Sequence, residues 1–555
     1  MSRVLSSVSS SPTRESASSK LSIPRLVRPG GKRASSQLRI LLLSSEVAPF
    51  AKTGGLADVA GALPKELQAL GHDVRVMLPK YAVVRERGFN FRDASGLKQV
   101  RVDMGRRKYV VSFKSAFLPD SSVTASSPQQ RKSGPQSRQG KGKRKGSHSP
   151  VPVYFLEYDP FYNRDSLYLD PSSGKDWMDN PERFTLFCRA ALAAVKTMDW
   201  QPDIIHCNDW QTAFVPYLLK SERAGDPFFQ NTRTLLSIHN LAYQGNFDPR
   251  VLGSIGVPKE YFQPMGPFEF YGKFSFLKVG LIYADLLNTV SENYAREIQS
   301  SPEFGVGLEG ILTARTKDLF GIINGLDVDV WNPETDPRIP ANFGKSDLSS
   351  KAVCKKELCK KCGLPYSPDT PVIGIISRLA AQKGFDLLEN IIDQLFKLDI
   401  QLVLLGTGEE RYHKLFKKIS RKYPSKTSIH LTFDDALAHW IEAGSDMFLM
   451  PSKYEPCGLN QMMSMRYGTV PVVRKTGGLA DTVKDVDEHE NGNGFVFKNY
   501  DRKELLDAIG RAVDRFSNKR AWKKIMLSGM IRDFSWEASA RKYVTLYEKA
   551  LNRNR

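Results

Sequence analysis

Short apolar runs alternate with longer stretches that have the spacing of amphipathic helices. Residues 39–44 read as a buried strand, and a glycine-containing turn leads from it into a helix that reaches about Leu70. Strands alternating with helices indicate parallel sheets, so the chain is predicted to be an α/β protein. Further strand-like runs occur at 74–78, 151–156, 203–206, 234–238 and 287–290, and the alternation begins again at 372–377, 401–405 and 447–450.

A proline-rich stretch at 331–337 lies between the two series of strands. We place a domain boundary there, which predicts an N-terminal Rossmann-like domain at 37–335 and a C-terminal one at 336–535. No apolar run is long enough to cross a bilayer, so we expect no membrane partner. Six cysteines in 555 residues are too few for a disulfide scaffold.

The net charge of +20 would suit a nucleic-acid-binding protein, but it is unevenly distributed. Residues 1–39 carry eight Lys or Arg against one acid, and residues 121–150 carry seven against none. The remainder is only mildly basic, which suits a small anionic ligand and disfavours a nucleic-acid partner.

Two segments lack the apolar blocks of a folded core. Residues 1–36 contain 12 serines and resemble either a disordered tail or a targeting peptide. A cytoplasmic protein is favoured, and the alternative is the plastid stroma if 1–36 is a transit peptide. The basic insertion 121–150 is predicted to be a disordered surface loop, with contact to a polyanion as the alternative.

The heptapeptide Lys-Thr-Gly-Gly-Leu-Ala-Asp occurs at 52–58 and again at 475–481, each time after an expected strand and at the start of an expected helix. Paired glycines allow close approach of a ligand, and helix N–H groups attract negative charge. A tight turn without a ligand is the alternative for either copy. Neither copy has the dinucleotide-binding spacing, which disfavours nicotinamide enzymes.

Charged residues follow several of the expected strands. Arg378 and Lys383 stand five residues apart and could both bind a diphosphate, although a solvated loop is the alternative. Glu455 follows the strand at 447–450 and could bind sugar hydroxyls or stabilise a cationic transition state. Asp209 and His239 also end strands and could enter the same site, where Tyr243 and Trp210 could stack on sugar rings.

Metal binding is disfavoured. Cys354, Cys359 and Cys362 lack a fourth Cys or His nearby, and Asp327 and Asp329 form an isolated Asp-x-Asp in a turn. We therefore expect neither a metal nor a cofactor.

Together these segments resemble the bacterial-type glycogen synthases and plant starch synthases, glycosyltransferase family 5. The resemblance covers about residues 38–545 and is carried by the motifs at 45–59, 206–210, 239–245, 323–327, 331–333, 377–384, 455–458 and 475–481. It implies the GT-B architecture, with two Rossmann-like domains whose parallel sheets face a deep cleft. It also implies that the C-terminal helix, 536–555, returns to the N-terminal, acceptor-side domain.

The activity that the resemblance implies is retaining transfer of glucose from ADP-glucose to the non-reducing end of an α-1,4-glucan such as glycogen or starch. Catalytic roles then fall to Glu455, Arg378, Lys383, His239 and Asp209. Substrate-binding roles fall to Lys52, Thr53, Gly54, Gly55, Glu46, Tyr243, Cys457, Gly458, Leu459 and Asn460. Many relatives have threonine at the position of Asn460, so the resemblance does not define how Asn460 contacts the phosphate.

Alternatives remain at this stage. The donor could be UDP-glucose, and a non-catalytic glucan-binding protein would bind glycogen without turnover. A phosphorylase-like enzyme would need a lysine that binds pyridoxal phosphate, and no distinct motif for one is present. Same-face attack, with the departing phosphate taking the acceptor's proton, is favoured over a covalent intermediate on Glu455.

Overall fold

The computed structural model describes residues 37–119 and 150–553. The described residues from Leu38 onward form one compact unit. The tail 1–36 and the insertion 121–149 lie outside the described residues, so the predictions for them, including the plastid alternative, stay predictions. So does the cytoplasmic location. Across the described ranges no helix has both the length and the apolar character to span a bilayer.

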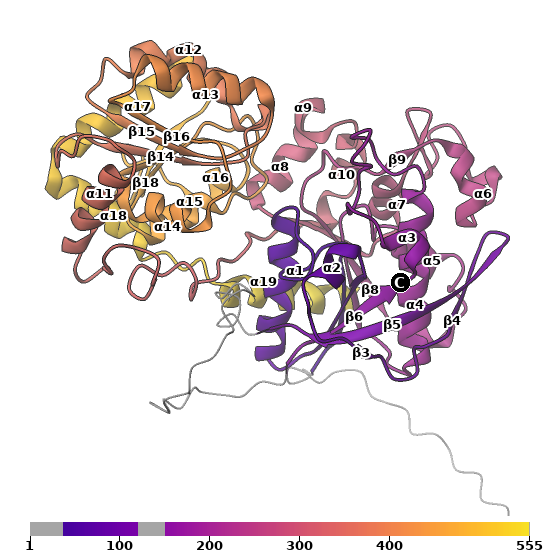
Figure 1. The fold of residues 1–555 in the computed structure, drawn as a ribbon. Helices are drawn as coiled ribbons and strands as arrows, with labels where there is room; N and C mark the ends of the chain where they lie inside the picture. The colour runs from indigo at the N-terminus through magenta and orange to yellow at the C-terminus, as the bar shows by residue number, and fades with distance from the viewer. Residues whose placement is uncertain (1–36, 120–149, 554–555) are drawn as a thin grey trace, which may run out of the picture. The chain divides into compact units, whose positions relative to one another are not determined.

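The first sheet of the described chain has ten strands in the order β13-β12-β8-β7-β1-β2-β6-β5-β3, with β4 paired to β5 (Figure 1). Its central pairs are parallel, whereas β3–β5, β4–β5 and β5–β6 are antiparallel. The bounds are β1 Arg39–Leu43, β2 Asp73–Pro79, β3 Arg92–Asp93, β4 Val100–Met104, β5 Arg107–Phe117, β6 Pro152–Glu157, β7 Ile204–Asn208, β8 Arg233–Ile238, β12 Leu286–Thr289 and β13 Leu319–Gly321.

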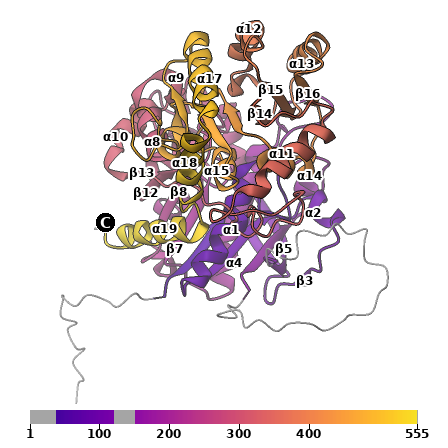
Figure 2. The same cartoon turned by 90° about the vertical axis from the view of Figure 1, so that its left-hand side faces the viewer.

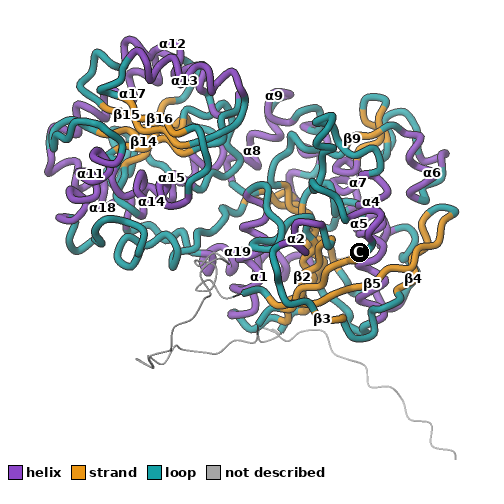
Figure 3. The backbone as a smooth tube through the Cα atoms, viewed as in Figure 1, coloured by secondary structure: helices purple, strands orange, loops and turns teal. Residues whose placement is uncertain are grey.

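A second, parallel sheet of six strands in the order β16-β15-β14-β17-β18-β19 is built from the later residues (Figure 3). The predicted α/β class with parallel sheets is confirmed, and the antiparallel edge is an addition to it. The bounds are β14 Val372–Ile376, β15 Gln401–Leu405, β16 Thr427–His430, β17 Met447–Met450, β18 Val470–Arg474 and β19 Phe495–Phe497. A small antiparallel sheet contains β9 Asn246–Phe247, β10 Glu269–Phe270 and β11 Lys273–Ser275.

Helices connect the strands and cover the sheets. Those between β1 and β13 are α1 Gly55–Ala69, α2 Ala82–Glu86, α3 Asp159–Tyr162, α4 Asn180–Thr197, α5 Val215–Lys220, α6 Leu252–Ile255, α7 Phe276–Tyr283, α8 Glu292–Ser300, α9 Pro302–Gly305 and α10 Glu309–Ala314. The later ones are α11 Ser349–Lys361, α12 Phe385–Leu395, α13 Glu410–Lys422, α14 Asp435–Gly444, α15 Asn460–Arg466, α16 Gly477–Thr482, α17 Arg502–Ser517, α18 Lys519–Met530 and α19 Trp536–Leu551.

The β1 sequence shows why these runs become central strands. Ile40, Leu41, Leu42 and Leu43 are fully buried, so both faces of the strand are apolar. A strand covered by helices on both faces needs such a continuous apolar run, whereas β4 alternates buried and exposed residues as an edge strand does. The strand expected at 151–156 is confirmed as β6, and its Pro152 pairs with Phe117 of β5.

The chain crosses between the two sheets twice, at adjacent points. The Leu326 N–H donates to the Phe534 carbonyl at 2.7 Å, and Gly325 lies so close to Trp536 that a side chain there would collide with the indole. Helix α19 then packs against α1 and β8 (Figure 2). The Tyr547 hydroxyl lies 2.9 Å from His206 Nδ1 in the buried core of the first sheet. The exact domain limits at 335 and 535 stay predictions.

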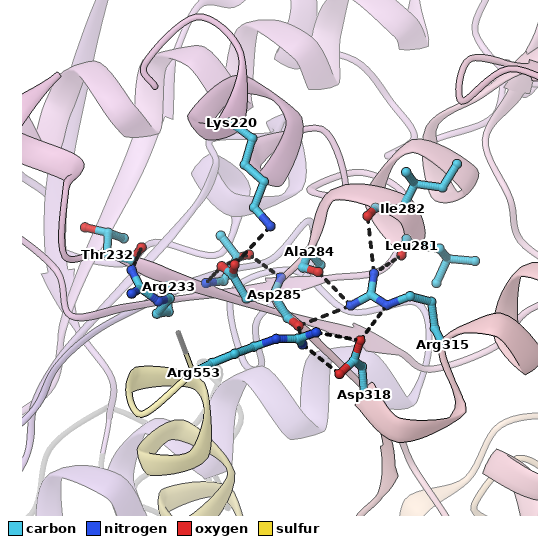
Figure 4. A network of polar contacts seen from close by, with 11 residues as sticks. Lys220, Thr232, Arg233, Leu281, Ile282, Ala284, Asp285, Arg315, Asp318 and Arg553 are labelled. Atoms are coloured by element: carbon cyan, nitrogen blue, oxygen red, sulfur yellow. Dashed lines mark hydrogen bonds and ion pairs between the residues drawn. The ribbon is translucent and has the colours of Figure 1, made fainter. Parts of the chain in front are cut away.

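The end of α19 is tied to the first sheet by ion pairs (Figure 4). Arg553 donates to the Asp285 carbonyl and pairs with the Asp318 carboxylate at 2.7 Å, and Arg315 donates to the same carboxylate at 2.8 Å. Burial alone would raise the pKa of Asp318, but the hydrogen bonds from Arg553 and Arg315 hold that pKa below its ordinary value. The last residues described are thus anchored to the N-terminal half.

Candidate functional site

The first copy of the repeated heptapeptide follows β1 and begins α1. Glu46 is buried, and its carboxylate accepts hydrogen bonds from the Thr53 N–H and hydroxyl and from the Gly54 N–H. The Tyr168 hydroxyl donates to the same carboxylate at 2.8 Å. Since its oxygens are occupied in this way, Glu46 shapes the loop; the substrate contact predicted for it stays a prediction.

Open space surrounds the two glycines of this copy. A side chain on Gly54 or Gly55 would meet no atom within 4 Å. Lys52 is half exposed and pairs with Asp58 of the same copy at 2.6 Å. The loop therefore offers free backbone and an accessible ammonium group, as a ligand-binding loop requires.

The second copy uses the same residues differently. Here the carboxylate of Glu297 on α8 accepts from the Thr476 hydroxyl at 3.2 Å and the Gly477 N–H at 3.0 Å. A side chain on Gly477 would collide with the Glu455 carbonyl, and one on Gly478 with the Cys457 carbonyl. In the second copy the glycines allow close packing against the 455–457 backbone. The predicted ligand loop therefore fits the first copy better than the second.

The two halves are joined at this point by reciprocal carboxylate contacts. While Glu297 of α8 accepts from the start of α16, Asp481 of α16 accepts from the Ser291 hydroxyl at 2.6 Å and the Asn293 N–H at 3.0 Å. A carboxylate is favourable at a helix N-terminus, so each helix stabilises the beginning of the other. Sequence reasoning missed Glu297, for which no motif gives a signal.

Lys383 and Glu455 form the closest charged pair among the predicted catalytic residues. Lys383 Nζ lies 2.6 Å from Glu455 Oε2, and the Ser452 hydroxyl donates to the same oxygen at 3.1 Å. The loop after β14 comes this near because Gly384, at φ +74°, packs against the Pro451 carbonyl where a side chain would collide. Both residues stand at carboxyl ends of neighbouring parallel strands, as predicted.

Arg378 is exposed at the end of β14, and its guanidinium makes no hydrogen bond or ion pair with the described residues. It nevertheless lies near the other candidates. Burial raises the pKa of Tyr454, and Tyr243, Arg378 and Glu455 are all close enough to influence it. Tyr454 thus marks a point where predicted residues from both halves of the chain approach one another.

The segment after Glu455 is held from within. Cys457 is buried, which raises the pKa of its thiol to about 12, so it stays a neutral thiol. Gly458 has φ +69°, Leu459 precedes α15, and the Asn460 side-chain amide donates to the Ile376 carbonyl at 2.7 Å. The phosphate contact of Asn460 stays a prediction, and its described partner is the end of β14.

Asp209 and His239 are brought together at the ends of β7 and β8. Asp209 Oδ1 accepts from the His239 N–H at 2.8 Å, and Asp209 itself has φ +55°, a strained conformation for a residue with a side chain. His239 Nε2 lies 2.9 Å from Asn208 Oδ1. The Asn208 amide nitrogen donates to Leu43, so Oδ1 accepts and the proton of a neutral His239 resides on Nε2.

Burial has opposite effects on these two side chains. It raises the pKa of Asp209 to about 7, and it lowers the pKa of His239 to about 4. At neutral pH His239 is therefore neutral, and Asp209 changes its charge near that pH. A carboxyl group that ionises near pH 7 is typical of catalytic sites.

Several residues singled out in the sequence lie in the core or apart from one another. Trp210 is buried and packs against Gly245, so it belongs to the core; Tyr243 is 55% exposed. Cys354 and Cys359 are buried with separate partners, and Cys362 Sγ lies 3.8 Å from His430 Nε2. Within 37–119 and 150–553, no three His, Cys, Asp or Glu side chains are grouped as metal ligands would be.

Comparison with known proteins identifies the family. Residues 39–314 match the model of the starch synthase catalytic domain, and residues 364–525 match that of glycosyl transferases group 1. The glycogen synthase of Geotalea daltonii is 46% identical over 515 residues, covering 93% of this chain and 99% of the relative. The chain belongs to the glycogen and starch synthase family.

Other glycogen and starch synthase relatives agree. The glycogen synthase of Syntrophotalea carbinolica is 45% identical with the same coverage. The catalytic domain of starch synthase IV from Arabidopsis thaliana, solved bound to ADP and acarbose, has a TM-score of 0.79 and 33% identity over 93% of this chain and 100% of that one. A sucrose-phosphate synthase from Thermosynechococcus elongatus shares the fold alone, at TM-score 0.53 and 17% identity over 92% and 99% of the two chains. The predicted family, GT-B fold and enzyme class are confirmed.

Proposed function

We propose that this glycogen and starch synthase family member transfers glucose from ADP-glucose to the 4-hydroxyl at the non-reducing end of an α-1,4-glucan, with retention of configuration. The observation that carries the proposal is the pairing of Lys383 with Glu455 at 2.6 Å, near an exposed Arg378 whose guanidinium pairs with none of the described residues. The ADP and acarbose in the starch synthase IV relative favour the same nucleotide and a glucan-like acceptor.

The two cations suit the leaving group. When the bond between the anomeric carbon and the phosphate oxygen breaks, the nucleoside diphosphate gains negative charge and the sugar gains positive charge. Arg378 and Lys383 offset the first of these, because cations fixed in place stabilise charge as it develops. The open space at Gly54 and Gly55 leaves room for the donor, and the Lys52 ammonium supplies a further cation from the first half.

The carboxyl groups suit the sugar. Glu455 is held by Lys383 and Ser452, so its electron density is shared with two donors and it is a poor covalent nucleophile. Same-face attack is therefore favoured: the acceptor oxygen bonds to the anomeric carbon while a departing phosphate oxygen takes the acceptor's proton. The Asp209 carboxylate stabilises the transient sugar cation, and neutral His239 binds a sugar hydroxyl through Nδ1, to which no described residue donates.

Side-by-side donor kinetics test the proposal. Purified protein is given ADP-glucose or UDP-glucose with glycogen, and chain extension and nucleoside diphosphate release are measured. We expect a higher kcat/KM with ADP-glucose and equimolar ADP and transferred glucose. Preference for UDP-glucose would change the donor only, while glycogen binding without turnover of either donor would favour the non-catalytic alternative.

A further inference from the structure

Large apolar side chains are exposed on neighbouring segments beside the candidate site. Four of them define what we call the hairpin patch: Tyr243 is 55% exposed, Met265 92%, Tyr271 79% and Val306 43%. Exposed apolar groups that gather in this way mark a binding surface more often than single exposed residues do.

Backbone strain coincides with this exposure. Met265, Tyr271 and Val306 have φ of +59°, +50° and +50°, and they are three of the five non-glycine residues with positive φ in the described ranges. Such a conformation is unfavourable for bulky and β-branched side chains, yet Tyr271 adopts it in a hairpin turn and Val306 at the C-terminus of α9. Glycine or asparagine is the usual residue at such positions, so the large apolar side chains found there instead indicate a functional role.

Tyr271 lies at the tip of a hairpin that side-chain hydrogen bonds stabilise. Phe270 pairs with Lys273, so Tyr271 and Gly272 form the two-residue turn between β10 and β11, and both have positive φ as a type I′ turn requires. Asn, Asp or Gly is favoured at the first turn position, and tyrosine is not. The turn is held all the same, because the Glu269 carboxylate accepts from the Gly272 N–H at 2.7 Å and the Met265 N–H at 3.1 Å.

The opposite side of the ring is accommodated by a glycine. A side chain on Gly307 would come within 2.9 Å of Tyr271 Cε2, so the bare backbone of Gly307 makes room for the tyrosine. Gly307 follows Val306, whose carbonyl accepts from the Gln244 side-chain amide at 3.0 Å. Gln244 follows Tyr243, and the Glu303 carboxylate, three residues before Val306, lies 3.9 Å from Lys453 Nζ, two residues before Glu455. The patch is thus continuous with the candidate transfer site.

We propose that the hairpin patch binds the α-glucan acceptor chain behind its growing end, with Tyr271 stacking on a pyranose ring. The inference rests on the proposed function, because it takes the glucan to be the acceptor. Aromatic rings with an apolar face and a polar tip suit sugars, whose C–H faces are apolar and whose edges carry hydroxyls. The continuity with Tyr243 favours the glucan over a protein partner or a second copy of this chain.

The test uses Tyr271→Asn and Tyr271→Phe in the full chain, with Tyr366→Ala as the matched control, since Tyr366 is 41% exposed outside the patch. Asparagine tolerates positive φ, so Tyr271→Asn should keep or raise the melting temperature while it raises the KM for glycogen about three- to tenfold. The KM for ADP-glucose should stay unchanged, and Tyr271→Phe should behave like the parent because it keeps the ring.

Retardation in glycogen-containing gels gives a second readout that needs no turnover. Loss of retardation in Tyr271→Asn alone supports the patch even if the parent protein transfers no glucose, which would contradict only the proposed function. Unchanged glycogen KM and retardation in Tyr271→Asn would overturn the inference while leaving the proposed function intact. A self-association that Tyr271→Asn abolishes, with unchanged glycogen binding, would also overturn it.

Discussion

Lys383 Nζ and Glu455 Oε2 lie 2.6 Å apart although 72 residues separate them in the sequence. The Lys383 side chain is 20% exposed and that of Glu455 8%, so the pair is largely shielded from water and its attraction is only weakly screened. The lysine is therefore fixed in position before substrate binds, and the carboxylate is already engaged.

Glu455→Ala should lower kcat about 100-fold or more, because Lys383 loses the partner that fixes it and the glucose loses a contact. Because we expect no covalent intermediate, added azide or formate should not restore turnover. The products of the variant with azide can be followed by NMR. Rescue with formation of a glucosyl azide would contradict same-face attack and identify Glu455 as a nucleophile.

Asp209 predicts a pH dependence of kcat/KM. Its pKa is about 7, so the carboxylate fraction rises between pH 6 and 8, and kcat/KM should rise with it. Asp209→Asn should lower the rate and remove this limb of the profile. If kcat/KM of Asp209→Asn still rose between pH 6 and 8, another group would be responsible for the pH dependence.

The same shift has a consequence for stability. The folded-state pKa of Asp209 is above its ordinary value of 3.8, so its contribution favours folding below pH 3.8 and is lost as pH rises towards 7. Urea unfolding should accordingly show Asp209→Asn gaining stability relative to the parent protein over this range. A constant difference would show that the pKa of Asp209 is not raised.

The reciprocal contacts of α8 and α16 should be energetically coupled. Glu297→Ala and Asp481→Ala each remove a carboxylate from a helix start, which typically costs about 1 kcal/mol of unfolding free energy. Because both act on the same pair of helices, a double-mutant cycle should give a coupling of about 0.5 kcal/mol or more. Asp393, which pairs with Lys422 elsewhere, is the control and should be additive with Glu297.

Asp318 should anchor the C-terminal helix. Asp318→Asn weakens the bonds from Arg315 and Arg553 and should cost about 1 kcal/mol at pH 7 in urea unfolding. The pKa of Asp318 is held low, so its contribution is present above the ordinary pKa and lost as pH falls below it. The deficit should shrink below about pH 4, and a deficit that persists there would contradict the ion-pair account.

Much of the fold could be predicted because buried parallel strands have continuous apolar runs, as in Ile40–Leu43 and 401–405. The β4–β5 edge was missed although Val100–Met104 alternates buried and exposed residues, the pattern of a strand with one solvated face. Glycines marked the loops correctly, since Gly384 and Gly458 have positive φ where a loop turns beside the site.

The rest of the candidate site depends on contacts that residue patterns do not encode. Identical heptapeptides differ in their surroundings, with open space at Gly54 and tight packing at Gly477. In the sequence, Glu297 is simply an acidic residue of an amphipathic helix, and only the structure shows its contact with α16. Tyr271 precedes a glycine, but only the structure shows the positive φ of the tyrosine.

The most direct measurement is glucose transfer from ADP-glucose to glycogen by Arg378→Ala and Lys383→Ala beside the parent protein. Each variant should lose about 100-fold or more in kcat with the fold intact, because the departing diphosphate loses a cation, and exposed Lys397→Ala should be unaffected. Unchanged turnover in both variants, or no transfer by the parent protein from ADP-glucose or UDP-glucose, would contradict the account.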